Sequence, residues 1–324
     1  MNLNGLHHVT SVSAKIGENA AFYTRLLGLR LVKKSVNQDD TSAYHLFYAD
    51  KVGSPGTDMT FFDWAHIPPE TRGTDSIVLT AFRVNGREAL DYWVARFDEN
   101  NVSHEGIESF AGKDVIRFED FEGQRLMLVD DEGAAYDGEI WEEPGIPIEY
   151  ALRGFYAAMI SVPQLEYVEP ILTKVLAFEE QKRTTYPDGR DIIIYNITGD
   201  GGAGNELWVL EEPNKPIARQ GYGATHHIAF RVADKDEQGY WRDRISSVGL
   251  PISGFIDRFY FNSIYFRISN GILFEIATDG PGFDADEDMA TLGEKLALPP
   301  FLEPQRELIE AKLKPINMPE TIGQ

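Results

Sequence analysis

Cysteine is absent from all 324 residues of this chain. Disulfides, cysteine-ligated zinc sites and thiol nucleophiles are therefore excluded. No apolar run approaches 18 residues, so no membrane span is predicted. The N-terminus lacks the basic region and apolar run of a signal peptide. Together these absences predict a cytoplasmic protein.

Positive charge is scarce as well. The chain has 30 Lys and Arg against 52 Asp and Glu, for a net charge of −22. Binding to a phosphate backbone needs a basic surface, so nucleic acid and anionic membranes are not expected as partners. We attribute the acidity to solubility. The 43% hydrophobic and 12% aromatic content is enough for a core, and the length allows two domains.

The two halves of the sequence repeat each other. Residues 82–96 and 230–244 share Phe-Arg-Val, then Tyr-Trp and Arg, at a constant offset of 148. Residues 5–29 and 154–178 match at an offset of 149. Each half divides into two modules with the pattern strand, helix and three strands. We therefore predict an α+β fold of four βαβββ modules, paired into open barrel-like sheets around a cleft.

The expected boundaries follow from composition. The N-terminal domain covers residues 1–140, with modules 5–64 and 75–133. The C-terminal domain covers residues 150–283, with modules 154–211 and 223–283. A tail, residues 284–324, begins acidic and contains a short helix starting near Pro304, with an apolar stripe of Leu308, Ile309 and Leu313. We interpret the tail as a packing arm or a pocket cover.

Local patterns give further expectations. In module one a helix over residues 18–27 ends at Gly28, and in module four a strand lies around 255–261. The dipeptides 92–93 and 240–241, each Tyr-Trp on a helix, are interpreted as core. His45 is interpreted as a core or supporting residue, whereas His66 and His104 are expected at the surface.

Two His-His pairs stand in similar settings near the two ends of the chain. They are His7-His8 and His226-His227, and Glu275 is a lone carboxylate in an apolar strand. Two imidazoles and one carboxylate are the ligand set of the facial triad that holds Fe(II). Because neighbours in a regular strand point to opposite faces, only one histidine of each pair is expected to be a direct ligand.

The duplication separates scaffold positions from candidate site positions. Three candidates have apolar counterparts in the other half: Ala157 for His8, Leu79 for His227 and Met127 for Glu275. Scaffold roles should recur in both halves, and these three residue types do not. We therefore predict a metal site that is shared by the first and fourth modules.

Several motifs together carry a family resemblance. They are residues 6–10 (LHHVT), 44–50 (YHLFYAD), 53–57 (GSPGT), 226–227 (HH), 274–275 (FE) and 286–288 (DED). With them, the chain resembles the vicinal oxygen chelate superfamily of glyoxalases, bleomycin resistance proteins and extradiol dioxygenases. Within it, the chain is most similar to two-domain ring-cleaving dioxygenases that act on hydroquinones. In that family the terminal modules pair with each other.

The resemblance implies roles for individual residues. His8, His227 and Glu275 would bind Fe(II), with Mn(II) as an alternative. The surrounding pocket would be built from five further residues: His7, Thr10, His226, Arg258 and Tyr265. His226 or Tyr265 would act as the acid-base partner, Arg258 would stabilise negative charge, and His7 and Thr10 would orient ligands or substrate. The segment 257–261 departs from the family pattern.

The expected function is an Fe(II)-dependent dioxygenase that opens a hydroquinone- or catechol-type ring with O2, in aromatic degradation or quinone detoxification. Its partners would be a small aromatic diol, O2 and a second copy of the chain in a homo-oligomer. One alternative is a glyoxalase-like isomerase or thiol transferase. That class expects a fourth carboxylate ligand, yet strand 58–63 has carboxylates only at its ends, Asp58 and Asp63. The other alternative is a non-catalytic protein that binds an aromatic compound.

Overall fold

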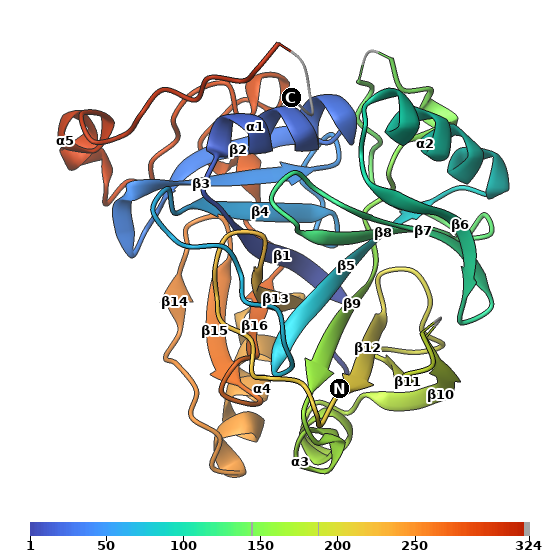
Figure 1. Ribbon diagram of the computed structural model, residues 1–324. Coiled ribbons are helices and arrows are strands. Elements are labelled where there is room, and N and C mark those ends of the chain that lie inside the picture. The colour runs from blue at the N-terminus through green and yellow to red at the C-terminus, as the bar shows by residue number, and fades with distance from the viewer. Residues whose placement is uncertain (144, 187, 321–324) are drawn as a thin grey trace.

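The chain folds as four βαβββ modules that build two curled eight-stranded sheets, which confirms the predicted α+β class (Figure 1). This computed structural model describes residues 1–143, 145–186 and 188–320. Each sheet combines one module from each half of the sequence, so the sheets do not coincide with the sequence halves. The pairing of first and fourth modules was expected from the candidate ligands.

The first sheet joins the first and fourth modules in the order β14-β15-β16-β13-β1-β4-β3-β2. Its strands are β1 (Leu6–Ser13), β2 (Arg30–Asn37), β3 (Asp40–Ala49), β4 (Asp58–Asp63), β13 (Thr225–Val232), β14 (Ile256–Asp257), β15 (Asn262–Arg267) and β16 (Leu273–Thr278). The two modules meet where β1 and β13 pair antiparallel at the middle of the sheet.

The second sheet joins the second and third modules in the order β10-β11-β12-β9-β5-β8-β7-β6. Its strands are β5 (Ser76–Val84), β6 (His104–Phe110), β7 (Lys113–Glu119), β8 (Arg125–Asp130), β9 (Phe155–Val162), β10 (Glu179–Thr185), β11 (Asp191–Asn196) and β12 (Glu206–Glu211). Here β5 and β9 form the central antiparallel pair.

The helices of the second half repeat those of the first half at the same offsets as the sequence repeat. The module helices are α1 (Ile16–Ala21) with the π-turn η1 (Phe22–Leu26), α2 (Arg87–Glu99), α3 (Leu165–Pro170) with the π-turn η3 (Ile171–Val175), and α4 (Lys235–Ser247). The α1–η1 unit recurs as α3–η3 at 149 residues, and α2 recurs as α4 at 148. Gly28, at φ +72°, closes the first helix in the left-handed region, as predicted.

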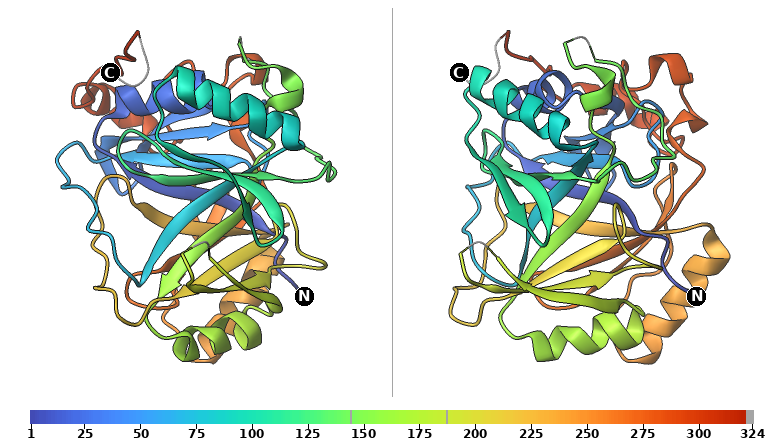
Figure 2. Two further views of the ribbon diagram at one scale, coloured as in Figure 1. Left: turned by 45° about the vertical axis from the view of Figure 1, so that its right-hand side comes forward. Right: turned by 90° about the vertical axis from the view of Figure 1, so that its right-hand side faces the viewer.

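Each sheet has an outer face and an interior face. The outer faces pack under the helices, with α1 and α2 near one end of the molecule and α3 and α4 near the other (Figures 1 and 2). The largest buried cluster lies on this side and includes both helical tryptophans, Trp93 and Trp241. The interiors are separate: the candidate ligands lie in the first sheet, and a second apolar cluster fills the other.

The tail lies against β2 and α1, in red beside blue in Figure 1. It contains η4 (Phe283–Ala285), η5 (Met289–Thr291), η6 (Glu303–Gln305) and α5 (Arg306–Glu310), with a short η2 (Ile148–Tyr150) between the halves. Lys33 of β2 is fully buried, and its ammonium contacts the carboxylates of Asp286 (2.7 Å) and Glu287. Among the described residues, no helix combines the length and the hydrophobicity needed to cross a bilayer.

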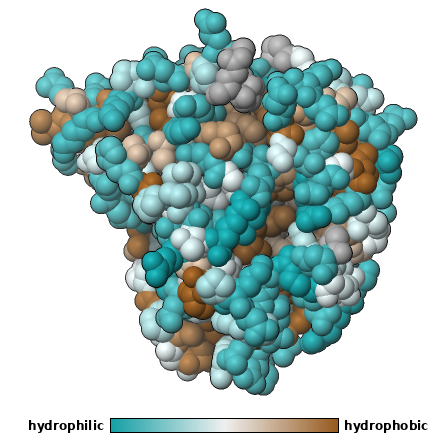
Figure 3. Space-filling view, viewed as in Figure 1, coloured by the Kyte–Doolittle hydropathy of each residue, from teal (hydrophilic) through white to brown (hydrophobic). Residues whose placement is uncertain are grey.

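Three local predictions were wrong. The strand expected at 255–261 covers only β14, because Phe259 adopts φ +73° and the chain turns there. Tyr240 is 40% exposed, although its neighbour Trp241 is core. Leu308 is 67% exposed, so Ile309 anchors α5 instead. Isolated exposed apolar residues of this kind are ordinary, and the face in Figure 3 is covered mainly by hydrophilic residues.

Candidate metal centre

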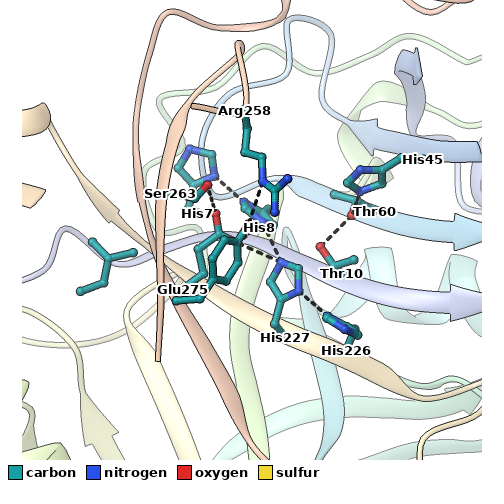
Figure 4. Close-up of polar contacts among 12 residues, drawn as sticks. His7, His8, Thr10, His45, Thr60, His226, His227, Arg258, Ser263 and Glu275 are labelled. Atoms are coloured by element: carbon teal, nitrogen blue, oxygen red, sulfur yellow. Dashed lines mark hydrogen bonds and ion pairs between the residues drawn. The ribbon is translucent and has the colours of Figure 1, made fainter. Parts of the chain in front are cut away.

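Three buried side chains converge inside the first sheet. His8 comes from β1, His227 from β13 and Glu275 from β16, which are adjacent strands (Figure 4). The Nε2 atoms of the two histidines lie 3.2 Å apart. Glu275 Oε2 lies 3.2 Å from Nε2 of His8 and 3.0 Å from Nε2 of His227. These are the three residues that the duplication separated from the scaffold, and they form a group that could hold a metal ion.

A β-bulge at the first histidine of each pair shapes the centre. The β1–β13 ladder skips His7 on one strand and His226 on the other. A bulge breaks the strict alternation of faces, so each first histidine contacts the second, with ring centroids 5.0 and 5.1 Å apart. The second sheet has bulges at the matching positions, Val78 and Tyr156. The bulges therefore belong to the scaffold, and the histidines make use of them.

The hydrogen bonds of His7 fix the tautomer of His8. Burial lowers the pKa of His7 to about 3, so its ring is neutral. Its Nε2 lies 3.2 Å from the carbonyl of Thr278, which can only accept, so Nε2 carries the proton. His7 Nδ1 must then accept from His8 Nδ1 at 2.9 Å. In the neutral ring that a metal ion requires, this assignment leaves Nε2 of His8 with a lone pair that faces the centre.

His226 supports His227 in a similar way but from outside the cavity. The Nδ1 atoms of the two rings are 2.8 Å apart. His226 packs edge-on against Phe62 and Trp64, and burial lowers its pKa to about 3. It opens onto another surface cavity rather than the one beside His227. Any contribution of His226 to proton transfer in the centre therefore passes through His227.

Glu275 is held as a carboxylate in a fully buried position. Burial alone would raise its pKa, but the imidazoles of His8 and His227 outweigh burial and hold the pKa well below its usual range. Its Oε1 accepts a hydrogen bond from Ser263 Oγ at 2.5 Å. Its Oε2 accepts no hydrogen bond from the described residues, although it is buried. An unpaired carboxylate oxygen that faces two imidazole nitrogens is a costly arrangement without a cation.

The donor set fits a divalent metal ion. Two ligands at right angles around one ion, each about 2.1 Å from it, lie about 3.0 Å apart. The three observed separations are 3.0, 3.2 and 3.2 Å. Imidazole nitrogens with a carboxylate suit first-row metals such as iron, manganese or zinc. Among the described residues no fourth His, Asp or Glu joins the group, so part of the coordination sphere stays open.

A small cavity of about 40 Å³ lies beside the centre. Both His8 and His227 line it, together with Arg258 and Tyr265. Arg258 Nε donates to the Tyr265 hydroxyl at 3.4 Å, and Arg258 Nη2 donates to Asp39 at 2.9 Å. Burial raises the pKa of Tyr265, which keeps the phenol protonated. Typical ligand pockets hold roughly 300–1,000 Å³, so the side chains that line this cavity must move apart to admit even a small aromatic ring.

A second polar chain runs from β1 to β3. The hydroxyls of Thr10 and Thr60 are 2.8 Å apart, and His45 Nε2 lies 2.8 Å from the Thr60 hydroxyl. Thr10 is buried in the wall instead of lining the cavity, whereas His45 lines it. Thr60 of β4 is the structural equivalent of Glu275 of β16. Thr60 pairs with the residue two positions after His8, and Glu275 pairs with the residue two positions after His227. A threonine thus stands where a fourth carboxylate would be expected by symmetry.

The other sheet has the same scaffold without polar ligands. Ala157, Leu79 and Met127 all lie in one buried apolar cluster. Met127 pairs with Arg117 in the same register in which Glu275 pairs with Tyr265. The two interiors therefore share a scaffold and differ in residue type at the candidate ligand positions.

Sequence reasoning missed Ser263, Thr60 and Asp39 as partners of the candidate residues. Residues two apart in a strand share a face. Ser263 lies two residues before the candidate Tyr265 in β15, and Thr60 lies two residues after the buried Asp58 in β4, so alternation could have placed both on the interior face. No local signal marks the ion pair of Asp39 with Arg258, because 219 residues separate them.

The comparisons with known proteins agree with this geometry. The model of the Glyoxalase/Bleomycin resistance protein/Dioxygenase superfamily matches residues 5–128 and 154–279. The chain belongs to this superfamily. The predicted resemblance is therefore confirmed.

Relatives within the superfamily are named as dioxygenases. MhqA of Bacillus subtilis (strain 168), provisionally named a ring-cleaving dioxygenase, is 47% identical over 98% of this chain and 100% of its own length. The chlorohydroquinone/hydroquinone 1,2-dioxygenase of Sphingobium indicum is 30% identical over 97% of both chains. A crystal structure of a provisionally named dioxygenase from Bacillus subtilis has a TM-score of 0.88 and 35% identity over 97% of each chain. This superfamily member is accordingly an enzyme of the dioxygenase type.

Proposed function

We propose that this enzyme is an Fe(II)-dependent dioxygenase that opens the ring of a hydroquinone- or catechol-type diol with O2. The observation that carries the proposal is the three-ligand group of His8, His227 and Glu275, with donor atoms 3.0 to 3.2 Å apart. It is the ligand set used by Fe(II) oxygenases that leave positions open for substrate and O2. The names of MhqA and of the Sphingobium enzyme support the same reaction class.

Bound Fe(II) would acidify a coordinated phenol and pass electron density between the ring and O2. The residues of the chain would supply the remaining functions. His7 would fix the tautomer of His8, and both His7 and His226 would hold the neighbouring ring in the orientation that presents Nε2. Both oxygen atoms of O2 end in the product as a carbon–carbon bond beside a hydroxyl-bearing carbon breaks, so no other oxidant is consumed.

Arg258 and Tyr265 are the proposed groups that act on the substrate. The Arg258 guanidinium lines the cavity and would stabilise negative charge on a phenolate or a reduced oxygen atom. The Tyr265 hydroxyl accepts a hydrogen bond from Arg258, which leaves its own proton free for an oxygen atom in the cavity. Tyr265 is therefore a better acid-base candidate than His226, because it lines the cavity and His226 does not. Thr10 would hold Thr60 and so support the wall.

Thr60 weighs against a glyoxalase-like isomerase. Such a site expects a fourth protein ligand, and the symmetry-related position in β4 holds a hydroxyl that is already hydrogen-bonded to Thr10 and His45. Asp58 and Asp63 lie at the ends of β4 and are not part of the ligand group. The maize glyoxalase I structure, with a TM-score of 0.62 at 14% identity over 85% of this chain and 92% of its own, shares the fold alone.

The test is anaerobic reconstitution with Fe(II), followed by O2 uptake with hydroquinone, methylhydroquinone and catechol. We expect one O2 consumed per ring opened, and loss of uptake after metal removal or in His227→Ala. His66→Ala, a change at an exposed histidine, is the matched control and should retain uptake. Activity without metal, or turnover of methylglyoxal with a thiol in place of a diol, would overturn the proposal.

A further inference from the structure

The cavity beside the candidate ligands contains one imidazole to which no role has been given. His45 projects from β3, and its ring is held between Phe47 and Phe62, with centroids 4.0 and 4.4 Å away. Burial lowers its pKa well below the usual value, so the ring is neutral. A neutral imidazole has one donor nitrogen and one acceptor nitrogen, and can pair with a hydroxyl in either direction.

Only one of the two ring nitrogens of His45 is occupied. Nε2 is paired with the Thr60 hydroxyl at 2.8 Å, and Thr60 is in turn paired with Thr10. Within the described part of the chain, Nδ1 has no hydrogen-bond partner. It is also not one of the unpaired polar atoms that are fully shielded from solvent. Since His45 lines the cavity, Nδ1 is available to a molecule inside it. The aromatic neighbours and Thr60 fix the orientation of the ring.

Several other polar groups on that side of the cavity are already engaged, and Asn37 Oδ1 accepts from the backbone N–H of Asp39. Gln38 donates to the carbonyl of Arg258, Ser35 donates to the carbonyl of Ala297, and Asp39 is paired with Arg258. Figure 4 shows His45 and Thr60 well apart from Glu275, with His8 and Arg258 between them in the view. The cavity therefore has a polar end at the ligand group and a separate polar point at His45.

The two isomeric diols would use this cavity differently. In a 1,2-diol the hydroxyls are adjacent, so both lie at the end of the ring that faces the ligand group. In a 1,4-diol the second hydroxyl points away from the first, toward the opposite wall. We propose that His45 binds the distal hydroxyl of a 1,4-diol and thereby selects hydroquinones over catechols. This inference rests on the proposed function only for the choice of substrate class.

The test measures binding rather than turnover. Zn(II), which has no redox chemistry and accepts the same donor types, is loaded anaerobically, and the affinities for hydroquinone and catechol are measured by calorimetry. We expect the wild type to prefer hydroquinone. His45→Phe keeps the aromatic packing and removes both nitrogens, so hydroquinone affinity should fall about tenfold, as for one lost hydrogen bond. Catechol affinity should change less than about twofold.

Two further variants keep the inference testable if His45→Phe folds poorly. His45→Asn retains a polar group near the position of Nδ1 and should recover part of the hydroquinone preference. Thr60→Val keeps the volume of the side chain and removes the partner of Nε2, so a smaller loss specific to hydroquinone is expected. The control is His66→Phe, at an exposed histidine, which should leave both affinities unchanged.

Other results would overturn the inference. Equal losses for both diols would mean that His45 only packs the wall, and unchanged affinities would mean that it does not contact the ligand. Failure of the proposed function is seen separately, as absence of O2 uptake by the Fe(II) form. In that case, a preference of the Zn(II) form for hydroquinone that is lost in His45→Phe would still support the inference. Ring opening by the Fe(II) form, with no preference for hydroquinone that depends on His45, would refute the inference and leave the proposed function standing.

Discussion

Ser263→Ala probes how the carboxylate of the centre is held in place. Ser263 donates to Glu275 Oε1 at 2.5 Å, and both residues are fully buried. The other carboxylate oxygen faces the imidazoles of His8 and His227. Without the hydroxyl, Oε1 would have no donor in a site that solvent does not reach, and the carboxylate could rotate away from the ligand position.

The size of the effect follows from the chemistry of the bond. A hydrogen bond to a charged group contributes about 1.5–3 kcal/mol, and loss of a group that orients a metal ligand costs about 10- to 100-fold in metal affinity. The middle of that energy range, about 2 kcal/mol, corresponds to about 30-fold. We therefore expect Zn(II) or Fe(II) affinity to fall about 30-fold, and the metal-free fold to lose about 2 kcal/mol.

The assay is metal competition with a chromophoric chelator, together with urea denaturation of the metal-free protein. Ser35→Ala is the matched control: Ser35 is also buried and also donates to a single acceptor, the carbonyl of Ala297, but it does not contact the ligands. It should lose stability without losing metal affinity. Metal affinity of Ser263→Ala within about twofold of wild type would refute the reasoning.

Three further predictions concern the rest of the fold. Lys33→Met leaves two tail carboxylates without their buried cation, and we expect urea denaturation to give a loss of about 3–5 kcal/mol; a loss under about 1 kcal/mol would contradict this. Burial raises the pKa of Asp120 from its ordinary 3.8 to about 7. The folded state therefore holds a proton that the unfolded state releases, and the stability contributed by this group declines as pH rises from about 4 to 7. The Tm of Asp120→Asn relative to wild type should accordingly be higher at pH 8 than at pH 5, and parallel Tm profiles would exclude this assignment. In the tail, Ile309→Ala should cost about 2–4 kcal/mol and Leu308→Ala less than about 0.5 kcal/mol by the same denaturation measurement, because Ile309 is buried and Leu308 is exposed; similar losses would mean that α5 is not anchored as the structure has it.

The repeat in the sequence predicted the scaffold well. Constant offsets of 148 and 149 residues carried over to the helices and the central strand pairs, because duplicated modules must bury equivalent faces. The same comparison selected three residues whose types do not recur, and they meet in space. The comparison was sufficient here because equivalent positions of the duplicated strands keep the same register, so a changed residue type stands out.

Other features depend on contacts that a local pattern does not encode. The bulges at His7 and His226 change which way these rings point, although regular alternation puts them on the opposite face. The bulge brings His226 into contact with His227, yet His226 still faces a different cavity, as alternation predicts. The turn at Phe259 shortens the strand before Arg258. The bulges arise where β1 pairs with β13 of a distant module, and the turn lies between β14 and β15 of one module.

The meeting of β1 with β13 links the assembly of the centre to protein synthesis. The two candidate histidine ligands are separated by 219 positions, and the candidate carboxylate ligand arrives later still, in the last strand before the tail. Such long-range pairing makes folding slow. While the ribosome is still translating the fourth module, the emerging polypeptide has at most two of the three ligands, so a nascent or truncated chain should bind an ion weakly and stay chemically inert.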